Sequence, residues 1–181
     1  MKKVKIPFDA HIWNIQVIKK PSELLKAVFR YIHPAELKTE LNEMMKYSFN
    51  GKIRKNESSS TSLLTFNILR SIIRVSYSLY AYPKKKLRKK TTCVSDSNEY
   101  HLFIGNLTSE EYADPLVTFK NVFKKQSFEQ IEFDLFDIVE HALSKSVDNP
   151  SDDISISFIN IHRLLDACWL IYKRENDYED A

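Results

Sequence analysis

The sequence is poor in glycine and cysteine, with two of each among 181 residues. Two glycines leave little material for tight β-turns or for glycine-rich loops that hold phosphates, so the common nucleotide-binding loops are excluded. Cys93 and Cys168 lie far apart, without cysteine or histidine neighbours at zinc-ligand spacing, which is typical of reduced thiols. We therefore expect a helical protein in the cytoplasm, or in the nucleus if the source is eukaryotic.

Long apolar stretches without charge are also missing. Residues 63–82 form the most apolar window and are long enough to span a bilayer, but Arg70 and Arg74 lie near its centre. Each would cost about 3 kcal/mol there. The first nine residues have neither the apolar stretch nor the cleavage site of a signal peptide. The sequence thus predicts a buried helix over 63–82 and no membrane span.

Charge is distributed unevenly along the chain, although the net charge is only +3. Residues 1–90 contain 20 Lys and Arg against 6 Asp and Glu, a net charge of +14. Residues 91–181 contain 7 against 18, a net charge of −11. Halves of opposite charge attract each other, within one chain or between chains.

Apolar residues at helical spacing predict a succession of helices. Ser22 and Glu23 are typical of a helix start, Pro34 of the first position of the next helix, and Thr108 with Glu111 of a capping box. Residues 100–104 could form a short extended segment. The helices are expected at about 22–32, 34–50, 63–82, from 108 onward, 115–125, 127–144 and 151–173.

The helical pattern repeats. A shift of 94 residues places residues 21–51 on 115–145 without a gap, with five identities in 31 pairs, and a shift of 93 places residues 66–70 on 159–163. Two amphipathic helices share an apolar pattern by default, but the common order and spacing of three elements favours duplication. We expect an all-α, internally duplicated bundle of two helix–helix–long-helix units about a pseudo-twofold axis, with the long helices central.

The predicted organisation has three parts. Residues 1–82 form a basic unit, 83–98 a basic and polar linker, and 99–181 an acidic unit, with both units sharing one core. The linker contains six positive charges in eight residues. Such a run could bind an acidic protein surface, including the second half of this chain, or nucleic-acid phosphates. It could also be a solvated loop without a specific partner. These residues are Lys84, Lys85, Lys86, Arg88, Lys89 and Lys90.

Arg70 and Arg74 lie one helical turn apart. Exposed to solvent, they would extend the basic surface. Buried, they would need carboxylate partners from the acidic half.

A polar Asn-Ile-x-Arg motif occurs in both units, at Asn67/Arg70 and at Asn160/Arg163. It indicates either a pair of symmetric polar pockets or, more simply, a packing feature with each arginine bound to a carboxylate or a helix C-terminus.

Carboxylate and imidazole side chains also stand one turn apart in the second half. Asp137 and His141 fall opposite the apolar stripe of their helix, and His162 with Asp166 is expected to be a surface ion pair. We predict no metal site and no cofactor. Cys168 is expected in the core, and neither it nor Cys93 has an identifiable base partner for catalysis.

No motif assigns a reaction, so the sequence favours a non-catalytic interaction or scaffold module over an enzyme. Its basic surface would face an anionic partner, and its acidic second half would cover that surface or recruit a basic partner. The partner would be another protein or a second copy of the chain. A nucleic-acid-binding accessory protein using residues 84–90 is the closest alternative, and an unrecognised enzyme is the third.

Overall fold

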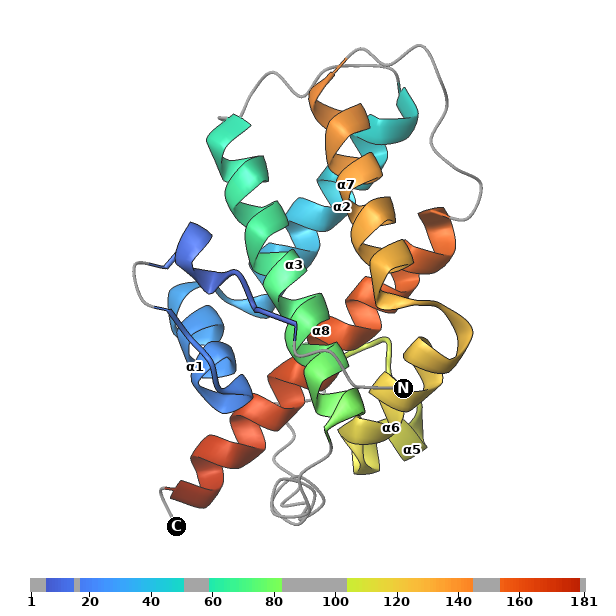
Figure 1. Cartoon of the computed structure of the whole chain (residues 1–181). Coiled ribbons are helices and arrows are strands. Elements are labelled where there is room, and N and C mark those ends of the chain that lie inside the picture. The colour runs from blue at the N-terminus through green and yellow to red at the C-terminus, as the bar shows by residue number, and fades with distance from the viewer. Residues whose placement is uncertain (1–5, 15–16, 51–58, 83–103, 145–153, 180–181) are drawn as a thin grey trace.

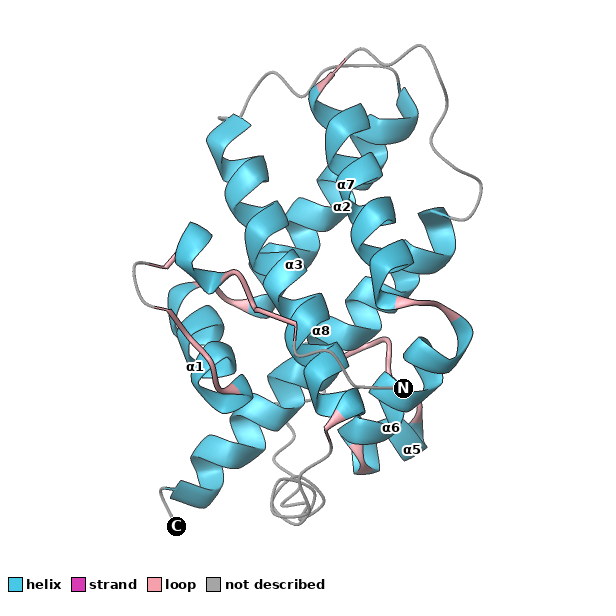
Figure 2. Ribbon diagram, viewed as in Figure 1, coloured by secondary structure: helices cyan, strands magenta, loops and turns pink. Residues whose placement is uncertain are grey.

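The computed structural model describes residues 6–14, 17–50, 59–82, 104–144 and 154–179, which are almost entirely helical (Figure 2). This part of the chain contains seven α-helices, one short 3-10 helix and no strand, so the prediction of an all-α fold is confirmed. The elements are η1 (Ala10–Ile12), α1 (Pro21–Tyr31), α2 (Pro34–Asn50), α3 (Ser59–Ala81), α5 (Ser109–Ala113), α6 (Pro115–Lys125), α7 (Phe128–Leu143) and α8 (Ile154–Glu179).

In the first half, prolines set the helix starts. Pro21 occupies the first turn of α1, and Lys20 precedes it as an N-cap without a side-chain capping bond. The expectation that Ser22 caps the helix start is therefore wrong, because Pro21, which has no amide to satisfy, is already the first helical residue and the N-cap is Lys20, two residues before Ser22. Ile32 is extended and ends α1. The His33 carbonyl then accepts the amide of Glu36 at 3.0 Å as α2 begins.

In the second half, side chains cap the starts of α5, α6 and α7, and the capping box that the sequence predicts at Thr108 and Glu111 is confirmed. Thr108 and Glu111 form a capping box, with Glu111 N donating to Thr108 Oγ1 at 3.3 Å and Thr108 N donating to Glu111 Oε2 at 3.1 Å. Asp114 caps α6, which also has proline in its first turn, and Ser127 caps α7. Each capping oxygen satisfies an amide that has no partner inside the helix.

The two longest helices, α3 and α8, cross at the centre of the bundle (Figure 1). Helices α2 and α7 pack against each other at one end. On opposite sides of the crossing, α1 contacts α3 and α8, and α6 contacts the same two helices. The short α5 packs on α6 and α8, where Arg174 donates to the carbonyls of Tyr112 and Ala113 at the end of α5.

A single apolar cluster contains side chains from both halves. Leu41 of α2 and Leu135 of α7, paired by the 94-residue shift, are both fully buried. Replacing either by alanine would remove about 2–5 kcal/mol of stability. The largest fully buried side chains are Phe119, Leu24, Leu25, Leu37, Leu41, Met44, Ile68, Leu69, Ile72, Ile73, Ile131 and Leu135.

One described helix is long and apolar enough to cross a membrane by length and composition, the stretch Ile154–Asn176 of α8. Of its apolar window, 72% is buried inside the bundle. The core helix of a soluble protein passes the same test, so this single helix is weak evidence for a span.

Some predicted features lie outside the described residues. These are the linker 83–98 and residues 100–103 of the expected extended segment. Ile104, which belongs to that segment, is described as irregular backbone packed against the core.

Candidate functional site

The N-terminal segment of residues 6–14, here called the strap, lies across α3. Trp13 Nε1 donates to Ser71 Oγ at 2.9 Å, and Ser71 Oγ donates to the Phe8 carbonyl at 2.9 Å. Asp9 has left-handed backbone, with φ of 53°, a conformation that costs a non-glycine residue free energy. The strap is thus fastened to α3 at Ser71 by a side chain and by its own backbone.

Arg74 of α3 joins the strap to α7. Its guanidinium donates to the Pro7 carbonyl at 3.1 Å, to the Asp9 carboxylate and to both oxygens of Glu132. Arg74 is only 8% exposed. The hydrogen bonds with Glu132 raise its pKa, against burial, which lowers it, and the charges of Glu132 and Asp9 add to the rise. Arg74 is thus a permanently charged side chain that holds the strap to α7, with Asp9 and Glu132 as its carboxylate partners.

Arg70, one turn earlier, faces the same two carboxylates. Its nitrogens lie 3.5 Å from Asp9 Oδ2 and 3.6 Å from Glu132 Oε2. Both arginines therefore have one carboxylate partner from the acidic half and one from the strap, with Arg74 buried and Arg70 half-buried. An anionic ligand would have to compete with Asp9 and Glu132 for them.

A groove of about 620 Å³ opens beside this cluster, between α3 and α7. We call it the α3–α7 groove. The Phe66 ring of α3 meets the Phe136 ring of α7 edge to face, 6.2 Å between centroids. The groove is lined by Ile6, Pro7, Phe66, Arg70, Arg74, Phe128, Glu129, Glu132, Phe133 and Phe136.

Large apolar side chains are exposed along the groove. Phe133 is 60% exposed and Phe136 is 51% exposed, and Leu63, one turn before Phe66, is 49% exposed. Phe133 and Phe136 lie on the side of α7 opposite its buried stripe, together with Glu129 and Glu140. Neighbouring exposed aromatic residues beside a hollow are typical of a surface that another molecule covers.

Comparison of the chain with protein-family models, curated proteins and solved structures found no match in any of the three.

The second Asn-Ile-x-Arg motif lies in a different polar network. Arg163 Nη2 bonds the fully buried Glu111, and Asn160 donates to Gln126 Oε1 at 2.9 Å. Burial raises the pKa of Glu111, but hydrogen bonds from Asn121 and Thr108 and the charge of Arg163 together hold it below its usual range.

In the first motif, Asn67 donates to the Leu63 carbonyl of its own helix at 2.8 Å, while Arg70 pairs with Asp9 and Glu132. Each motif arginine thus has a carboxylate partner.

The prediction that His162 and Asp166 form a surface ion pair is wrong. They are 7% and 1% exposed, and the Asp166 carboxylate bonds Lys38 of α2 and receives the backbone and side-chain amides of Asn106 at 3.1 and 3.0 Å. Burial lowers the pKa of His162 to about 4, the Lys38 charge adds to this, and Asp166 opposes it. Packing of α2 on α8 encloses the pair, which the pattern of one helix could not show.

His162 does not face a reactive group in the described region. Its Nε2 lies 3.0 Å from Asn42 Oδ1, and its ring packs edge to face on Phe158. Cys168 is buried as predicted, with Sγ 3.2 Å from Ser76 Oγ. Burial raises the pKa of the Cys168 thiol to about 12, against the hydrogen bond with Ser76.

Asp137 and His141 pair along α7, with 3.0 Å between Oδ1 and Nδ1, and both are half-buried. Among the described residues, no three His, Cys, Asp or Glu side chains gather closely enough to hold a metal ion.

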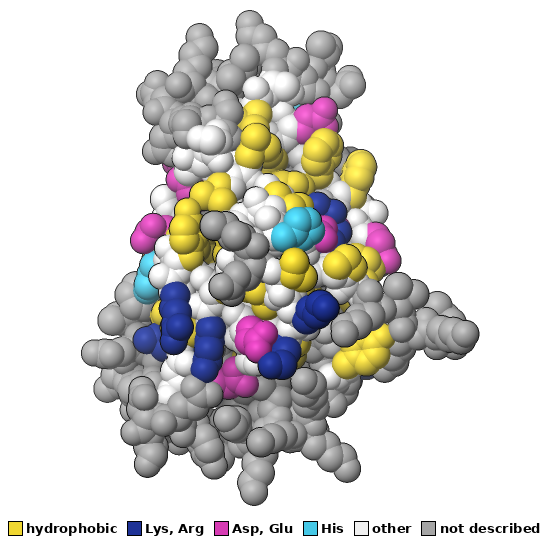
Figure 3. All heavy atoms as spheres, turned by 60° about the vertical axis from the view of Figure 1, so that its left-hand side comes forward, with side chains coloured by type: hydrophobic (Ala, Val, Ile, Leu, Met, Phe, Trp, Pro, Cys, Tyr) yellow, Lys and Arg dark blue, Asp and Glu magenta, His cyan; other side chains and the backbone are white. Residues whose placement is uncertain are grey.

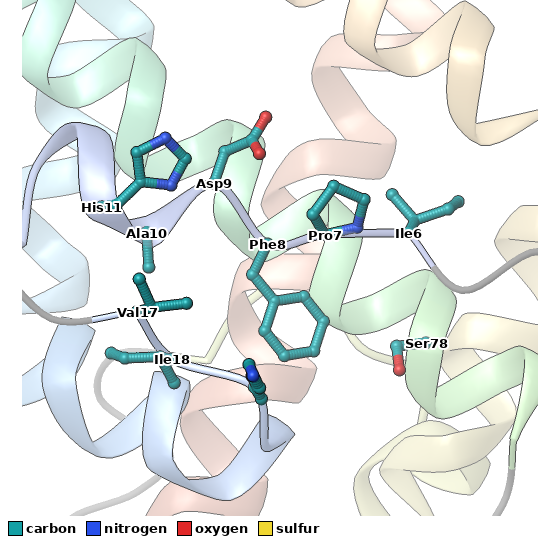
Figure 4. A pocket seen from close by; sticks show the side chains of 10 residues that line it. Ile6, Pro7, Phe8, Asp9, Ala10, His11, Val17, Ile18 and Ser78 are labelled. Atoms are coloured by element: carbon teal, nitrogen blue, oxygen red, sulfur yellow. The ribbon is translucent and has the colours of Figure 1, made fainter.

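A second cavity, of about 350 Å³, lies under the strap (Figure 4). In that view the Phe8 ring points to one side of the strap and the Asp9 carboxylate to the other. The lining is mostly apolar, with Ser78 contributed by α3. Asp9 is bonded to Arg74, and the other ionisable side chains in the lining are His11 and Lys19.

The basic residues 84–90 lie outside the described residues, so the structure does not place them relative to Arg70 and Arg74. On the face shown in Figure 3, apolar side chains reach the surface over the upper and middle part, and most of the Lys and Arg side chains in view gather below them. Lys19, Lys20 and Arg30, at and beside α1, are exposed.

Sequence reasoning missed the groove. The available signal was that Phe133 and Phe136 fall outside the stripe of Ile131, Leu135 and Ile138 on a helical wheel. Two phenylalanines on the otherwise acidic face of an amphipathic helix indicate either a further contact within the fold or a binding surface.

Proposed function

We propose that the protein is a non-catalytic helical interaction module that binds a partner protein in the α3–α7 groove. The observation that carries this proposal is the exposure of Phe133 and Phe136 beside a hollow of about 620 Å³. Burying such aromatic side chains is a main source of binding energy in protein interfaces. The contacts of Arg74 with Asp9 and Glu132 would hold the strap, α3 and α7 together at the groove before a partner arrives.

We further propose that the bundle is a duplicated three-helix unit. Helices α1 and α6 both have 11 residues and begin with proline. Both end with an extended residue whose amide bonds back one turn, Ile32 to Val28 and Gln126 to Val122. These residues are 94 apart, as in the predicted shift. The contacts of α1 and α6 with the central helices also correspond when the halves are exchanged.

The ion pairs between halves support the same proposal. Lys38 of α2 bonds Asp166 of α8, and Glu132 of α7 bonds Arg74 of α3. Lys38 and Glu132 are 94 residues apart, so equivalent positions on equivalent helices carry opposite charges. The opposite charges of the two halves would then attract each other within one chain, at the Lys38–Asp166 and Arg74–Glu132 contacts.

An anionic partner is the second candidate function, and the run 84–90 with the exposed cations near α1 favours it. Nucleic acid would bind with an affinity that falls steeply with salt. A mobility shift that disappears when Lys84, Lys85, Lys86, Arg88, Lys89 and Lys90 become serine would support it. Unchanged binding in that variant would exclude the run as the binding element.

The groove is tested by photocrosslinking in cells of the source organism. A photoreactive phenylalanine analogue at position 133 should give an adduct of one discrete mass. The matched control is the same analogue at Ile159 of α8, which is 54% exposed and is not part of the groove lining. Adducts of equal yield at both positions, or none at position 133, would contradict the proposed function.

A further inference from the structure

The charges that flank the groove point to the chemistry of its partner. On α7 the exposed residues Glu129, Phe133, Phe136 and Glu140 follow one another along a single face, so an acidic side chain stands at each end of the aromatic pair. The third acidic residue, Glu132, is engaged by Arg70 and Arg74. The charge presented to an incoming partner by this face of α7 is therefore negative.

Arg70 and Arg74, the two cations in the described lining of the groove, do not cancel this charge. Arg74 is only 8% exposed and holds Asp9 and Glu132. Arg70 lies within 3.6 Å of the same two carboxylates. Two guanidinium groups and two carboxylates neutralise each other, and Glu129 in the lining remains in excess.

The walls of the groove favour a helical partner. The two helical walls, α3 and α7, have their backbone groups bonded internally, and Ile6 and Pro7 of the strap line a further side, where the Pro7 carbonyl already accepts from Arg74. The described residues contain no strand edge to which an extended peptide could add. The backbone groups of a helix are already hydrogen-bonded to each other, so a helical partner needs to bury only its side chains in the groove. Glu129 and Glu140 are eleven residues apart, which corresponds to roughly 16 Å along α7.

We propose that the α3–α7 groove binds an amphipathic helix of a partner protein, with apolar side chains on Phe66, Phe133 and Phe136 and with basic residues near Glu129 and Glu140. This inference rests on the proposed function and specifies the partner's chemistry. The basic residues of the partner helix are spaced by about eleven positions, on either side of apolar residues at helical spacing.

The experiment is a selection from a phage-displayed library of helix-favouring peptides, in which basic, acidic and apolar residues are randomised. Peptides are selected on the full chain and counter-selected on the double variant Phe133→Ser/Phe136→Ser. Enriched sequences should carry two Lys or Arg about eleven positions apart around an apolar stripe. The Kd of a selected peptide should rise at least tenfold in Glu129→Lys/Glu140→Lys, and the difference should shrink at high salt.

The matched control is Ile156→Ser/Ile159→Ser, which removes two similarly exposed apolar side chains from α8, 55% and 54% exposed. This variant should bind the selected peptide as the wild type does. Circular dichroism verifies that each variant is folded. Enrichment of acidic peptides, or peptides that bind the two serine double variants equally, would overturn the inference.

Light scattering distinguishes a second copy of the chain from a foreign helix. A dimer that becomes a monomer in Phe133→Ser/Phe136→Ser would also overturn the inference, because the groove would then be a self-association surface. If position 133 still crosslinks one partner while no basic peptide is selected, the proposed function stands and the basic helix is wrong. Selected basic peptides without any crosslink in cells would instead contradict the proposed function.

Discussion

Replacing Lys38 by methionine should destabilise the protein strongly, although Lys38 lies on the outer helix α2. Its ammonium group bonds Asp166, a carboxylate that is 1% exposed. Methionine keeps the apolar stem and removes the charge, so Asp166 stays buried, and among the described residues its remaining hydrogen-bond donors are the two amides of Asn106, at 3.1 and 3.0 Å. Breaking a buried pair typically costs 3–5 kcal/mol, and the remaining hydrogen bonds place this case at about 3 kcal/mol.

The loss is measured by urea unfolding and by thermal melting followed by circular dichroism. For a chain of this size, 3 kcal/mol corresponds to a decrease of roughly 6–12 °C in Tm. The matched control on the same helix is Lys46→Met, because the Lys46 side chain is 62% exposed and its Nζ lies 3.6 Å from Glu43 Oε1. That exposed pair should contribute no more than about 0.5 kcal/mol.

A second readout separates electrostatics from packing. The positive charge of Lys38 lowers the pKa of His162, so Lys38→Met should raise that pKa above its value of about 4, as an NMR titration of the ring protons would show. The double variant Lys38→Met/Asp166→Leu removes both charges and should recover much of the stability. A loss below 1 kcal/mol in Lys38→Met, or a loss equal to that of Lys46→Met, would refute the reasoning.

Two further predictions concern buried groups. The unfolded chain protonates His162 near pH 6.5 and the folded protein only near pH 4, so the unfolded state binds more protons between these values and stability falls as the pH is lowered. Between pH 6.5 and 4.5 the wild type should lose about 2–3 kcal/mol more than His162→Gln in urea unfolding, and equal losses would contradict the buried neutral imidazole. Cys168, with a thiol pKa of about 12, should react with a disulfide thiol reagent at pH 8 at least a hundredfold more slowly in the native protein than in urea. The measurement uses Cys93→Ser to leave one thiol, and labelling at equal rates would show that the site opens to solvent.

Most of the helical framework could be predicted from the sequence, because its signals are local. Prolines fix the starts of α1, α2 and α6, and the capping box at Thr108 begins α5. Apolar periodicity then identifies the buried faces. The one incorrect cap, Ser22, arose from choosing the better capping side chain over the neighbouring proline that starts the helix.

The polar clusters could be predicted only in part, since they join residues far apart in the chain. The sequence indicates that a buried Arg74 needs a carboxylate from the acidic half, and Glu132 fits this expectation. The second carboxylate, Asp9, comes from the strap 65 residues away, and no local pattern connects it with α3. The burial of His162 and Asp166 depends in the same way on how α2 packs against α8.

The opposite charges at Lys38 and Glu132 bear on which pieces can assemble. If the halves descend from one unit, two first halves packed in the same manner would set Lys38 against Ile73, which occupies the position of Asp166, with Arg74 next to it. Two second halves would set Glu132 against Ala167, in the position of Arg74 and next to Asp166. Either assembly, of two first halves or of two second halves, would bury a charge without a partner, at a cost of about 3 kcal/mol or more. An ancestral dimer of identical subunits would thus have become a chain whose two halves bind each other and not themselves. The change required is an oppositely charged pair at each of the two contacts.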